Sequence, residues 1–172
     1  HHSLGGEAFR WDVSGMVALG EIPGGAYNSG ACCVSADGRV AAGSSGSSSI
    51  YYHGFRWEDG VFSSIGAPQG PEFYANGMSN DGTRIVGGGN WNGRWTGWIW
   101  QNGFSVLVPL NPSWAFADAI SDDGSVVVGS SGLLSNVATW HAVRWINGGA
   151  PQSLGDMPGE TGGSYARHLS SD

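Results

Sequence analysis

The sequence predicts an all-β protein built from tandem copies of one small antiparallel sheet. Three observations support this prediction: the 172-residue chain contains 31 Gly, a strand-like run ending in Trp recurs, and so does an apolar residue followed by Ser-x-Asp. The Trp residues are spaced 46, 43 and 45 residues apart, at Trp11, Trp57, Trp100 and Trp145. The Ser-x-Asp elements lie at 35–37, 79–81, 121–123 and 170–172. Self-similarity at a regular period is typical of β-propellers and other repeat architectures.

The distribution of glycines and apolar residues disfavours long helices. Gly recurs between short runs that are rich in Val, Ile, Trp and Phe. In a helix interior each Gly costs about 1 kcal/mol relative to Ala, whereas β-branched and aromatic residues suit pleated strands. The sequence therefore predicts strands almost throughout.

The charge and the hydropathy pattern exclude several classes of partner. The formal net charge is −7, and the seven basic residues are all Arg and are scattered, so nucleic acid, which requires clustered cations, is not expected as a partner. No run approaches the roughly 18–20 consecutive apolar residues of a membrane span, and residues 1–30 show no signal peptide. We interpret residues 1–2, His1-His2, as the remnant of a purification tag.

The Ser-x-Asp element predicts a hairpin in each copy. In three copies Gly follows the Asp, which gives Asp37-Gly38, Asp81-Gly82 and Asp123-Gly124 between two short apolar runs. Asp-Gly favours a tight hairpin because both residues tolerate a positive φ. The first arms are expected at 31–34, 75–78, 117–120 and 166–169, and the second arms are the apolar runs that follow.

A second pair of strands is expected in each copy. Its first strand carries the recurring Trp, at 9–11, 55–57, 98–100 and 143–145. Turn candidates follow at Ser14-Gly15, Asp59-Gly60, Asn102-Gly103 and Gly148-Gly149. One small sheet cannot bury its faces until neighbouring sheets stack against it, as the four-stranded blades of a propeller do. The predicted fold is therefore a β-propeller of four-stranded antiparallel blades, with about four repeat units.

The phase of the repeat predicts a single repeat domain over residues 1–172. Its units are expected at 1–29 (partial), 30–73, 74–115, 116–164 and 165–172 (partial). Because the terminal units are partial, three arrangements stay open: a small four-bladed ring, a fragment of a larger propeller, or two chains that associate to complete one ring. We favour the larger propeller.

The repeat contains two characteristic strings. The first is Ala-Phe-Arg-Trp at 8–11, followed by Leu-Gly at 19–20, and the second is Val-Ser-Ala-Asp-Gly at 34–38. In this the chain resembles the bacterial extracellular HAF repeat family, whose units carry an Ala-Phe-Arg-Trp-like element and a Val-Ser-x-Asp-Gly element. The resemblance covers nearly the whole chain, although the third copy has Ile99 in place of Arg. It implies a secreted or surface-attached bacterial protein and no established catalytic residues.

Residues that recur in every copy are expected to hold the repeat together. Each recurring Trp can bury about 150–250 Å² between sheets, and each Asp of Ser-x-Asp can accept hydrogen bonds from nearby amides in its turn. Calcium binding by these carboxylates is an alternative, but the turns lack the dense Asp and Asn spacing of a calcium loop. We expect Arg10, Arg56 and Arg144 to pair with the same carboxylates.

The two cysteines, Cys32 and Cys33, are adjacent. This spacing fits neither a zinc site nor an ordinary framework disulfide. We interpret them as small strand residues, with a vicinal disulfide as the alternative. The sequence predicts no metal site and no cofactor.

Function is expected where the copies differ at one structural slot, because the innermost strands of a propeller line its channel and entrance. Such a slot follows the recurring Ala at positions 31, 75, 117 and 166. We hypothesise a shallow ligand pocket with polar contacts from Asn76, Asp118, Arg167 and His168 and an apolar wall from Tyr74, Phe116 and Tyr165. In the alternative interpretation these side chains fill a closed axis or pair with one another.

A second cluster of aromatic residues precedes the Trp-bearing strands. Its members are Tyr51, Tyr52, Trp91, Trp95 and Trp140, with His141 beside them. Aromatic rings in polar loops can stack on sugars or anchor a protein partner, and they can equally cover the rim of a blade.

The sequence favours a non-enzymatic, secreted or cell-surface binding module for a glycan or protein ligand. The alternatives are a structural spacer and a carbohydrate-active enzyme, either a glycoside hydrolase or a polysaccharide lyase. An enzyme of that kind requires carboxylates at a defined separation. No pair among the best candidates is defined by spacing, these being Glu72, Asp118, Asp156 and Glu160.

Overall fold

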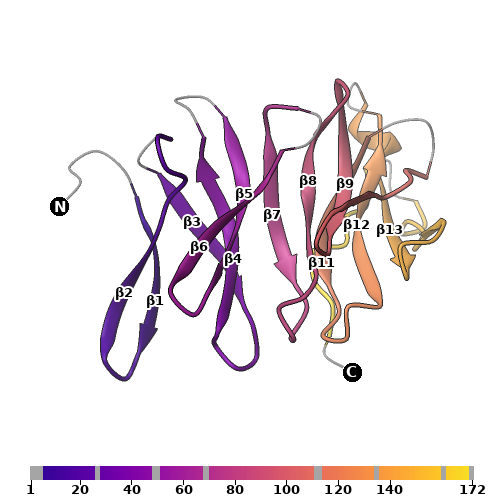
Figure 1. The fold of residues 1–172 in the computed structure, drawn as a ribbon. Coiled ribbons are helices and arrows are strands. Elements are labelled where there is room, and N and C mark those ends of the chain that lie inside the picture. Colours follow the sequence, from indigo (N-terminus) through magenta and orange to yellow (C-terminus); the bar gives the residue numbers. More distant parts are fainter. Residues whose placement is uncertain are drawn as a thin grey trace.

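The computed structural model describes residues 6–25, 28–47, 51–67, 70–110, 114–133, 136–159 and 162–170. Over these residues the chain forms antiparallel β-sheets and one short 3-10 helix, η1 (Val137–Thr139), which confirms the prediction of an all-β fold (Figure 1). No helix among the described residues is long and apolar enough to cross a membrane.

The strands form one two-stranded sheet and three four-stranded sheets. The first sheet consists of β1 (Ala8–Asp12) and β2 (Gly15–Gly20). The second contains, in spatial order, β3 (Ser29–Val34), β4 (Val40–Gly46), β5 (Tyr52–Glu58) and β6 (Val61–Gly66). The third contains β7 (Phe73–Met78), β8 (Ile85–Trp91), β9 (Arg94–Trp100) and β10 (Phe104–Val106). The fourth contains β11 (Trp114–Ile120), β12 (Val126–Gly132), β13 (His141–Ile146) and β14 (Pro151–Ser153).

The sheets follow one another in chain order, side by side (Figure 1). Their first strands contact each other, β3 with β7 and β7 with β11, and each of β7 and β11 also packs on the second and third strands of the preceding sheet. The sheets do not close into a ring, because the β1–β2 sheet and the β11–β14 sheet lie at opposite ends of the series. The structure is therefore a propeller-like, open series of blades.

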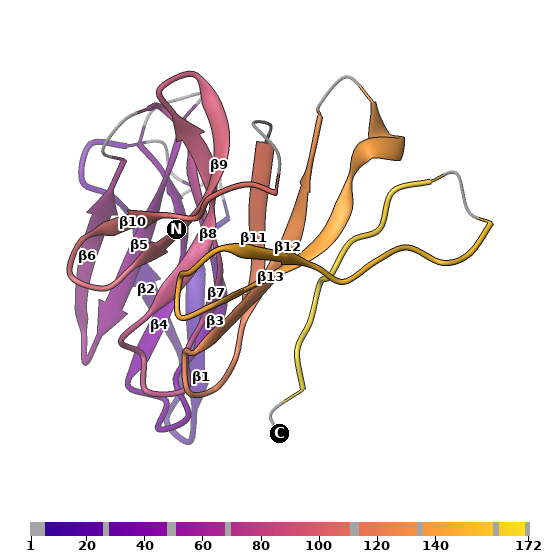
Figure 2. The ribbon, with the colours of Figure 1, turned by 90° about the vertical axis from the view of Figure 1, so that its right-hand side faces the viewer.

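One predicted strand is absent. The segment 166–169, expected as a first arm, is not a strand, although it runs beside the fourth sheet (Figure 2). The amide of Ala166 donates to the carbonyl of Gly129 at 3.3 Å, and the amide of Ser164 donates to that of Trp140 at 2.9 Å. No second arm among the described residues pairs with this segment to complete a hairpin.

The Ser-x-Asp element forms a hairpin loop of five or six residues with its own hydrogen bonds. In the third sheet the hydroxyl of Ser79 donates to the carboxylate of Asp81 at 2.6 Å, and that carboxylate also accepts from the amide of Thr83. The amide of Gly82 donates to the carbonyl of Ser79. The prediction of a positive φ at both residues of Asp-Gly was wrong here, because only the glycine has one, at 69° in Gly82. The Asp holds the loop through its side chain instead.

Two-residue turns join β5 to β6 at Asp59-Gly60 and β8 to β9 at Asn92-Gly93. In both turns each of the two central residues has a positive φ. This backbone matches the right-handed twist of the flanking strands, which explains why Asp, Asn and Gly recur there.

A β-bulge interrupts the first strand of every four-stranded sheet. The register shifts between Ala31 and Cys33, between Ala75 and Gly77, and between Ala117 and Ala119, so the residue between them stays unpaired. Opposite each Ala stands a glycine of the second strand: Gly43, Gly87 and Gly129. A Cβ on these glycines would overlap the carbonyl oxygen of the residue before the Ala. The recurring glycine is therefore required by the close approach of the two strands.

The recurring Trp residues do not all lie in the core. Trp57 and Trp145 are 5% and 0% exposed, and in the third sheet Trp98 is buried at 1% while Trp100 is half-buried. Trp11 is 70% exposed, so the prediction of a core role was wrong for this residue. Trp57 packs with Ala8 and Leu19 of the preceding sheet, whereas among the described residues no sheet precedes that of Trp11.

Two of the three recurring arginines join neighbouring sheets, but none of the three pairs with the predicted carboxylates. Arg10 donates to the carbonyl of Gly38 at 3.1 Å, and Arg56 donates to that of Gly82 at 3.3 Å. Each forms its ion pair within its own sheet, with Asp12 and Glu58 respectively. Arg144 instead donates to Gln152 of its own sheet. In each case the acceptor differs from the Ser-x-Asp carboxylate.

The third copy, which lacks this Arg, obtains the same contact from another position. Arg84, at the end of the Ser-x-Asp loop, donates to the carbonyl of Gly124 in the next sheet at 2.7 Å. The presence of Ile99 at the Arg position therefore does not remove the contact between the third and fourth sheets.

Gly87→Ala is expected to destabilise the protein by about 1–3 kcal/mol, because its methyl group would overlap the carbonyl oxygen of Tyr74. Gly30→Ala is the matched control, since a Cβ there meets no atom within 4 Å. Urea unfolding followed by Trp fluorescence measures both. Equal stability of the two variants would contradict the role assigned to the glycine.

The stability of the fold is expected to fall between about pH 4 and pH 2. The Ser121 hydroxyl and the Ser125 amide lower the pKa of Asp123 from 3.8 to about 2, and equivalent bonds lower the pKa values of Asp37 and Asp81. A carboxyl with a depressed pKa in the folded state stabilises it above the unfolded pKa, and that contribution is lost as pH falls through the folded value. Asp123→Asn should flatten this dependence, as measured by thermal unfolding at each pH. An unchanged slope would show that the turn carboxylates do not govern acid stability.

Candidate functional site

The bulges place three side chains at equivalent positions of adjacent first strands. The unpaired residues are Cys32 on β3, Asn76 on β7 and Asp118 on β11. A bulge redirects the side chain of its extra residue and is over-represented next to functional sites. These are the positions of the variable slot identified in the sequence, and β3, β7 and β11 lie side by side. We call Cys32, Asn76, Asp118 and the neighbouring Arg167 the bulge row.

Members of the bulge row contact the next sheet or segment. The Nδ2 of Asn76, an exposed residue, donates to the carbonyl of Ala117 at 2.8 Å. The Nη1 of Arg167 donates to Oδ1 of Asp118 at 3.3 Å. The structure therefore places Asn76 and Asp118 on adjacent first strands and pairs Asp118 with Arg167, and such a pair is what the alternative interpretation of the sequence expects.

Asp118 is the electrostatically unusual member of the row. Its side chain is only 12% exposed, whereas that of Arg167 is 64% exposed. Burial raises the pKa of Asp118, and the nearby charges of Arg167 and His168 offset this only in part. Its Oδ2 is buried without a hydrogen-bond partner among the described residues. A buried acceptor left unpaired costs about 1–3 kcal/mol, so a donor that reached Oδ2 would be bound favourably.

The aromatic residues of the predicted pocket form a continuous ladder. Six rings follow one another with neighbouring centroids 5.4 to 6.1 Å apart, in the order Tyr52, Tyr74, Trp95, Phe116, Trp140 and Tyr165. The ladder crosses from the second sheet to the C-terminal segment and unites the two aromatic clusters seen in the sequence. Because the rings cover one another's faces, Tyr74 and Phe116 do not form an open apolar wall. Tyr165, at the end of the ladder, is 42% exposed.

The remaining aromatic candidates lie outside the ladder. Trp91 packs on Phe73 and Phe104 in the third sheet. The Nδ1 of His141 lies 2.8 Å from the carboxylate of Asp156. A hydrogen bond from Ser164 lowers the pKa of that carboxyl, and His141 lowers it to a smaller extent. Glu160, a candidate carboxylate for hydrolysis, lies outside the described residues.

The two cysteines are free thiols with their sulfur atoms 2.8 Å apart. The hydrogen bond between the two sulfur atoms lowers the pKa of Cys32, and the same bond together with burial raises the pKa of Cys33. The described residues contain no group of three His, Cys, Asp or Glu side chains that could hold a metal ion.

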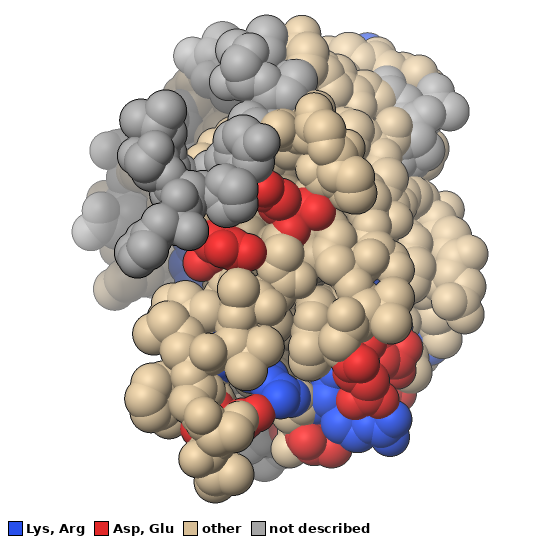
Figure 3. Space-filling model, turned by 60° about the vertical axis from the view of Figure 1, so that its left-hand side comes forward, with Lys and Arg blue, Asp and Glu red and all other residues tan. Residues whose placement is uncertain are grey.

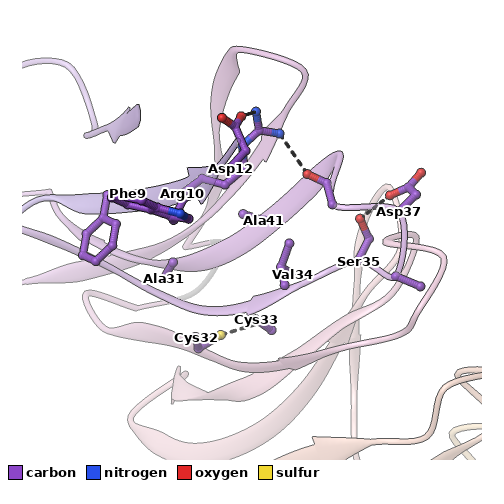
Figure 4. A pocket seen from close by; sticks show the side chains of 13 residues that line it. Phe9, Arg10, Asp12, Ala31, Cys32, Cys33, Val34, Ser35, Asp37 and Ala41 are labelled. Carbon is purple, nitrogen blue, oxygen red and sulfur yellow. Dashed lines mark hydrogen bonds and ion pairs between the residues drawn. The ribbon is translucent and has the colours of Figure 1, made fainter. Parts of the chain in front are cut away.

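The sequence analysis missed a hollow of about 660 Å³ between β1 and β3 (Figure 4). Its walls include Phe9 and Arg10 from β1 and Ala31 and Val34 from β3. The signal that could have revealed it is the partial first unit, whose described residues include no equivalent of β3 and β4.

Comparison with known proteins shows the fold alone. No family model and no curated protein matches the chain. The chain is similar to the structure of a protein assigned as TolB from Agrobacterium tumefaciens, with a TM-score of 0.61 and 14% identity, over 88% of this chain and 62% of that one. It is also similar to TolB from Acinetobacter baumannii, with a TM-score of 0.55 and 15% identity, over 83% of this chain and 35% of that one. The chain thus spans less than two thirds of either protein.

Arg167→Ala is expected to raise the pKa of Asp118 further, because it removes a nearby positive charge and a hydrogen-bond donor. An NMR titration of the Asp118 carboxyl carbon measures this. Arg39→Ala is the control, since Arg39 pairs with Asp59 and should leave the Asp118 curve unchanged. Identical Asp118 curves in both variants would contradict the pairing in the bulge row.

Proposed function

We propose that the chain is a non-enzymatic propeller module of a secreted or cell-surface bacterial protein and that it binds a ligand along the bulge row. One observation carries this proposal: three adjacent first strands each have a bulge at the same position, and the side chains there differ while the surrounding Ala and Gly recur.

The chemistry of the row favours a protein segment as the ligand. The unpartnered Oδ2 of Asp118 suits an amide, ammonium or guanidinium donor, and the exposed Asn76 and Arg167 supply further polar contacts. A glycan platform requires open ring faces on which a sugar can stack. The ladder covers most of its ring faces internally, so a glycan is the second choice.

The propeller itself is part of the proposal. The contacts between the first strands of successive sheets support a radial arrangement of blades, and the structural likeness to the two TolB proteins supports the same fold. Further blades, from the same polypeptide or from a second copy, would complete the ring. The resemblance to the HAF repeat units supports the secreted or surface location.

The proposal predicts that peptide arrays probed with the labelled protein yield saturable ligands that depend on the row. Asp118→Ala and Arg167→Ala should each weaken binding at least about tenfold, which corresponds to about 1.4 kcal/mol. Arg39→Ala, which breaks an exposed pair away from the row, should bind normally. An oligosaccharide array tested in parallel distinguishes the glycan alternative.

Two outcomes would contradict the proposal. Equal binding by Asp118→Ala and the parent protein would place the ligand elsewhere. The absence of any saturable ligand on either array would favour a structural spacer.

A further inference from the structure

The side chains of the adjacent residues Cys32 and Cys33 meet. In a regular strand, successive side chains point to opposite faces of the sheet, so two neighbouring cysteines are kept apart. The bulge in β3 interrupts this alternation, because the register shifts between Ala31 and Cys33 and leaves Cys32 unpaired. As a result the two sulfur atoms face each other at 2.8 Å (Figure 4).

The fold does not need sulfur at these positions. Asn76-Gly77 and Asp118-Ala119 occupy the same positions in the third and fourth sheets, and the bulge forms there as well. The two thiols are therefore not explained by the conformation of the strand.

One thiol of the pair is accessible, and its neighbour is held in place. Cys32 is exposed. Its equivalent Asn76 is exposed too, although the second sheet packs beside β7, so exposure at this position does not depend on what lies beside β3. Cys33 is half-buried and packs against the buried cluster that contains Ala42 and Phe73.

The two thiols control each other's ionisation. The hydrogen bond between them lowers the pKa of Cys32 and raises that of Cys33, and burial raises the pKa of Cys33 further. In Figure 3, which brings the side of β1 and β3 forward, the red and blue surfaces of the described residues meet near the lower edge, and most of the surface is uncharged. Cys32 is thus the exposed sulfur with the greater thiolate character, which is the property of an attacking thiol.

We infer that Cys32 and Cys33 form a thiol–disulfide exchange site that takes low-molecular-weight disulfides as substrates and closes into a Cys32–Cys33 disulfide. In the first step the Cys32 thiolate attacks one sulfur of the substrate. The S–S bond of the substrate breaks, one half leaves as a thiolate, and the other half stays bound to Cys32.

The second step closes the pair. Cys33 gives its proton to the departed thiolate and attacks the sulfur of Cys32, which expels the second half of the substrate as a thiolate that takes a proton from water. The proton that Cys32 had lost to water before the first step balances this one. The protein loses two hydrogen atoms and is oxidised, and the substrate is reduced to two thiols.

The bulge accommodates the closed form. Because Cys32 has no partner on β4 in the ladder, ring closure at this residue breaks no strand pairing. Adjacent Cα atoms lie about 3.8 Å apart, less than the roughly 4.4–6.8 Å of ordinary disulfides, and a disulfide outside that range is more easily reduced. Excess thiol is therefore expected to reopen the pair.

Closure also changes the bulge row, to which Cys32 belongs. It replaces an S–H donor by a sulfur atom that can only accept a hydrogen bond. The exchange reaction itself does not rest on the ligand proposed for the row, whose contacts are Asp118 and Arg167.

The test mixes the reduced, folded protein with oxidised glutathione and follows its intact mass after alkylation. The parent protein should lose two hydrogen atoms without keeping glutathione, and excess reduced glutathione should restore both thiols. Cys33→Ser should stop after the first step and accumulate a glutathione adduct on Cys32. Cys32→Ser should form its adduct at least about tenfold more slowly, because the remaining thiol is half-buried.

A peptide of residues 29–36, Ser-Gly-Ala-Cys-Cys-Val-Ser-Ala, is the matched control for adjacency in the sequence. It contains the same pair without the bulge. Conversion of the glutathione adduct to the closed form should be at least about tenfold slower in the peptide, since the folded protein holds the two sulfur atoms in contact. This comparison needs no variant, so it remains decisive if a substitution prevents folding.

Three results would overturn the inference. The first is a glutathione adduct that persists on the parent protein, which would show that Cys33 does not reach the sulfur of Cys32. The second is closure of the peptide as fast as that of the protein. The third is a disulfide-linked dimer as the main product, which would show that the thiols react between chains.

Discussion

The close approach of the first two strands in each sheet is the constraint on which the structure depends. It is possible because Gly43, Gly87 and Gly129 have no side chain to meet the carbonyl oxygen of the opposite strand. The first strand of each four-stranded sheet contains a bulge beside this approach, which leaves one residue unpaired. The unpaired residues occupy equivalent positions and form the bulge row. The same glycines thus give the repeat its shape and expose the positions at which the copies differ.

Three kinds of contact hold successive sheets together along their length. At the Ser-x-Asp loops, guanidinium groups bind a glycine carbonyl of the next sheet, and at the opposite ends of the strands the aromatic ladder runs from sheet to sheet. Between them lie the apolar clusters, in which Ala42 and Val86 bury the next first strand. Because each sheet is covered only by its neighbours, a sheet that lacks a neighbouring strand must expose apolar surface, as Trp11 and Val34 do.

Much of the fold and part of the site could be predicted from the sequence. The hairpins follow from Asp, Asn and Gly at fixed offsets, and the slot of Asn76 and Asp118 follows from the recurring Ala before it. The pairing of Arg167 with Asp118 was only one of the alternatives that the sequence left open, and the substitution of Arg84 for the Arg absent at position 99 could not be predicted. Both depend on which side chains of two separate sheets come within reach of each other, and the spacing along one copy contains no information about that.

The sequence by itself determined the all-β class, the four-stranded unit and the residues of its turns, because these depend on backbone preferences and on contacts within one repeat. Only the tertiary structure decided which recurring residues are buried. Trp11 and Trp57 occupy the same position in the motif, yet one is 70% and the other 5% exposed. Trp57 packs with Ala8 and Leu19 of the preceding sheet and with Ala41 of its own sheet, whereas the described residues provide no such neighbours for Trp11. Burial is therefore a property of the neighbours rather than of the motif.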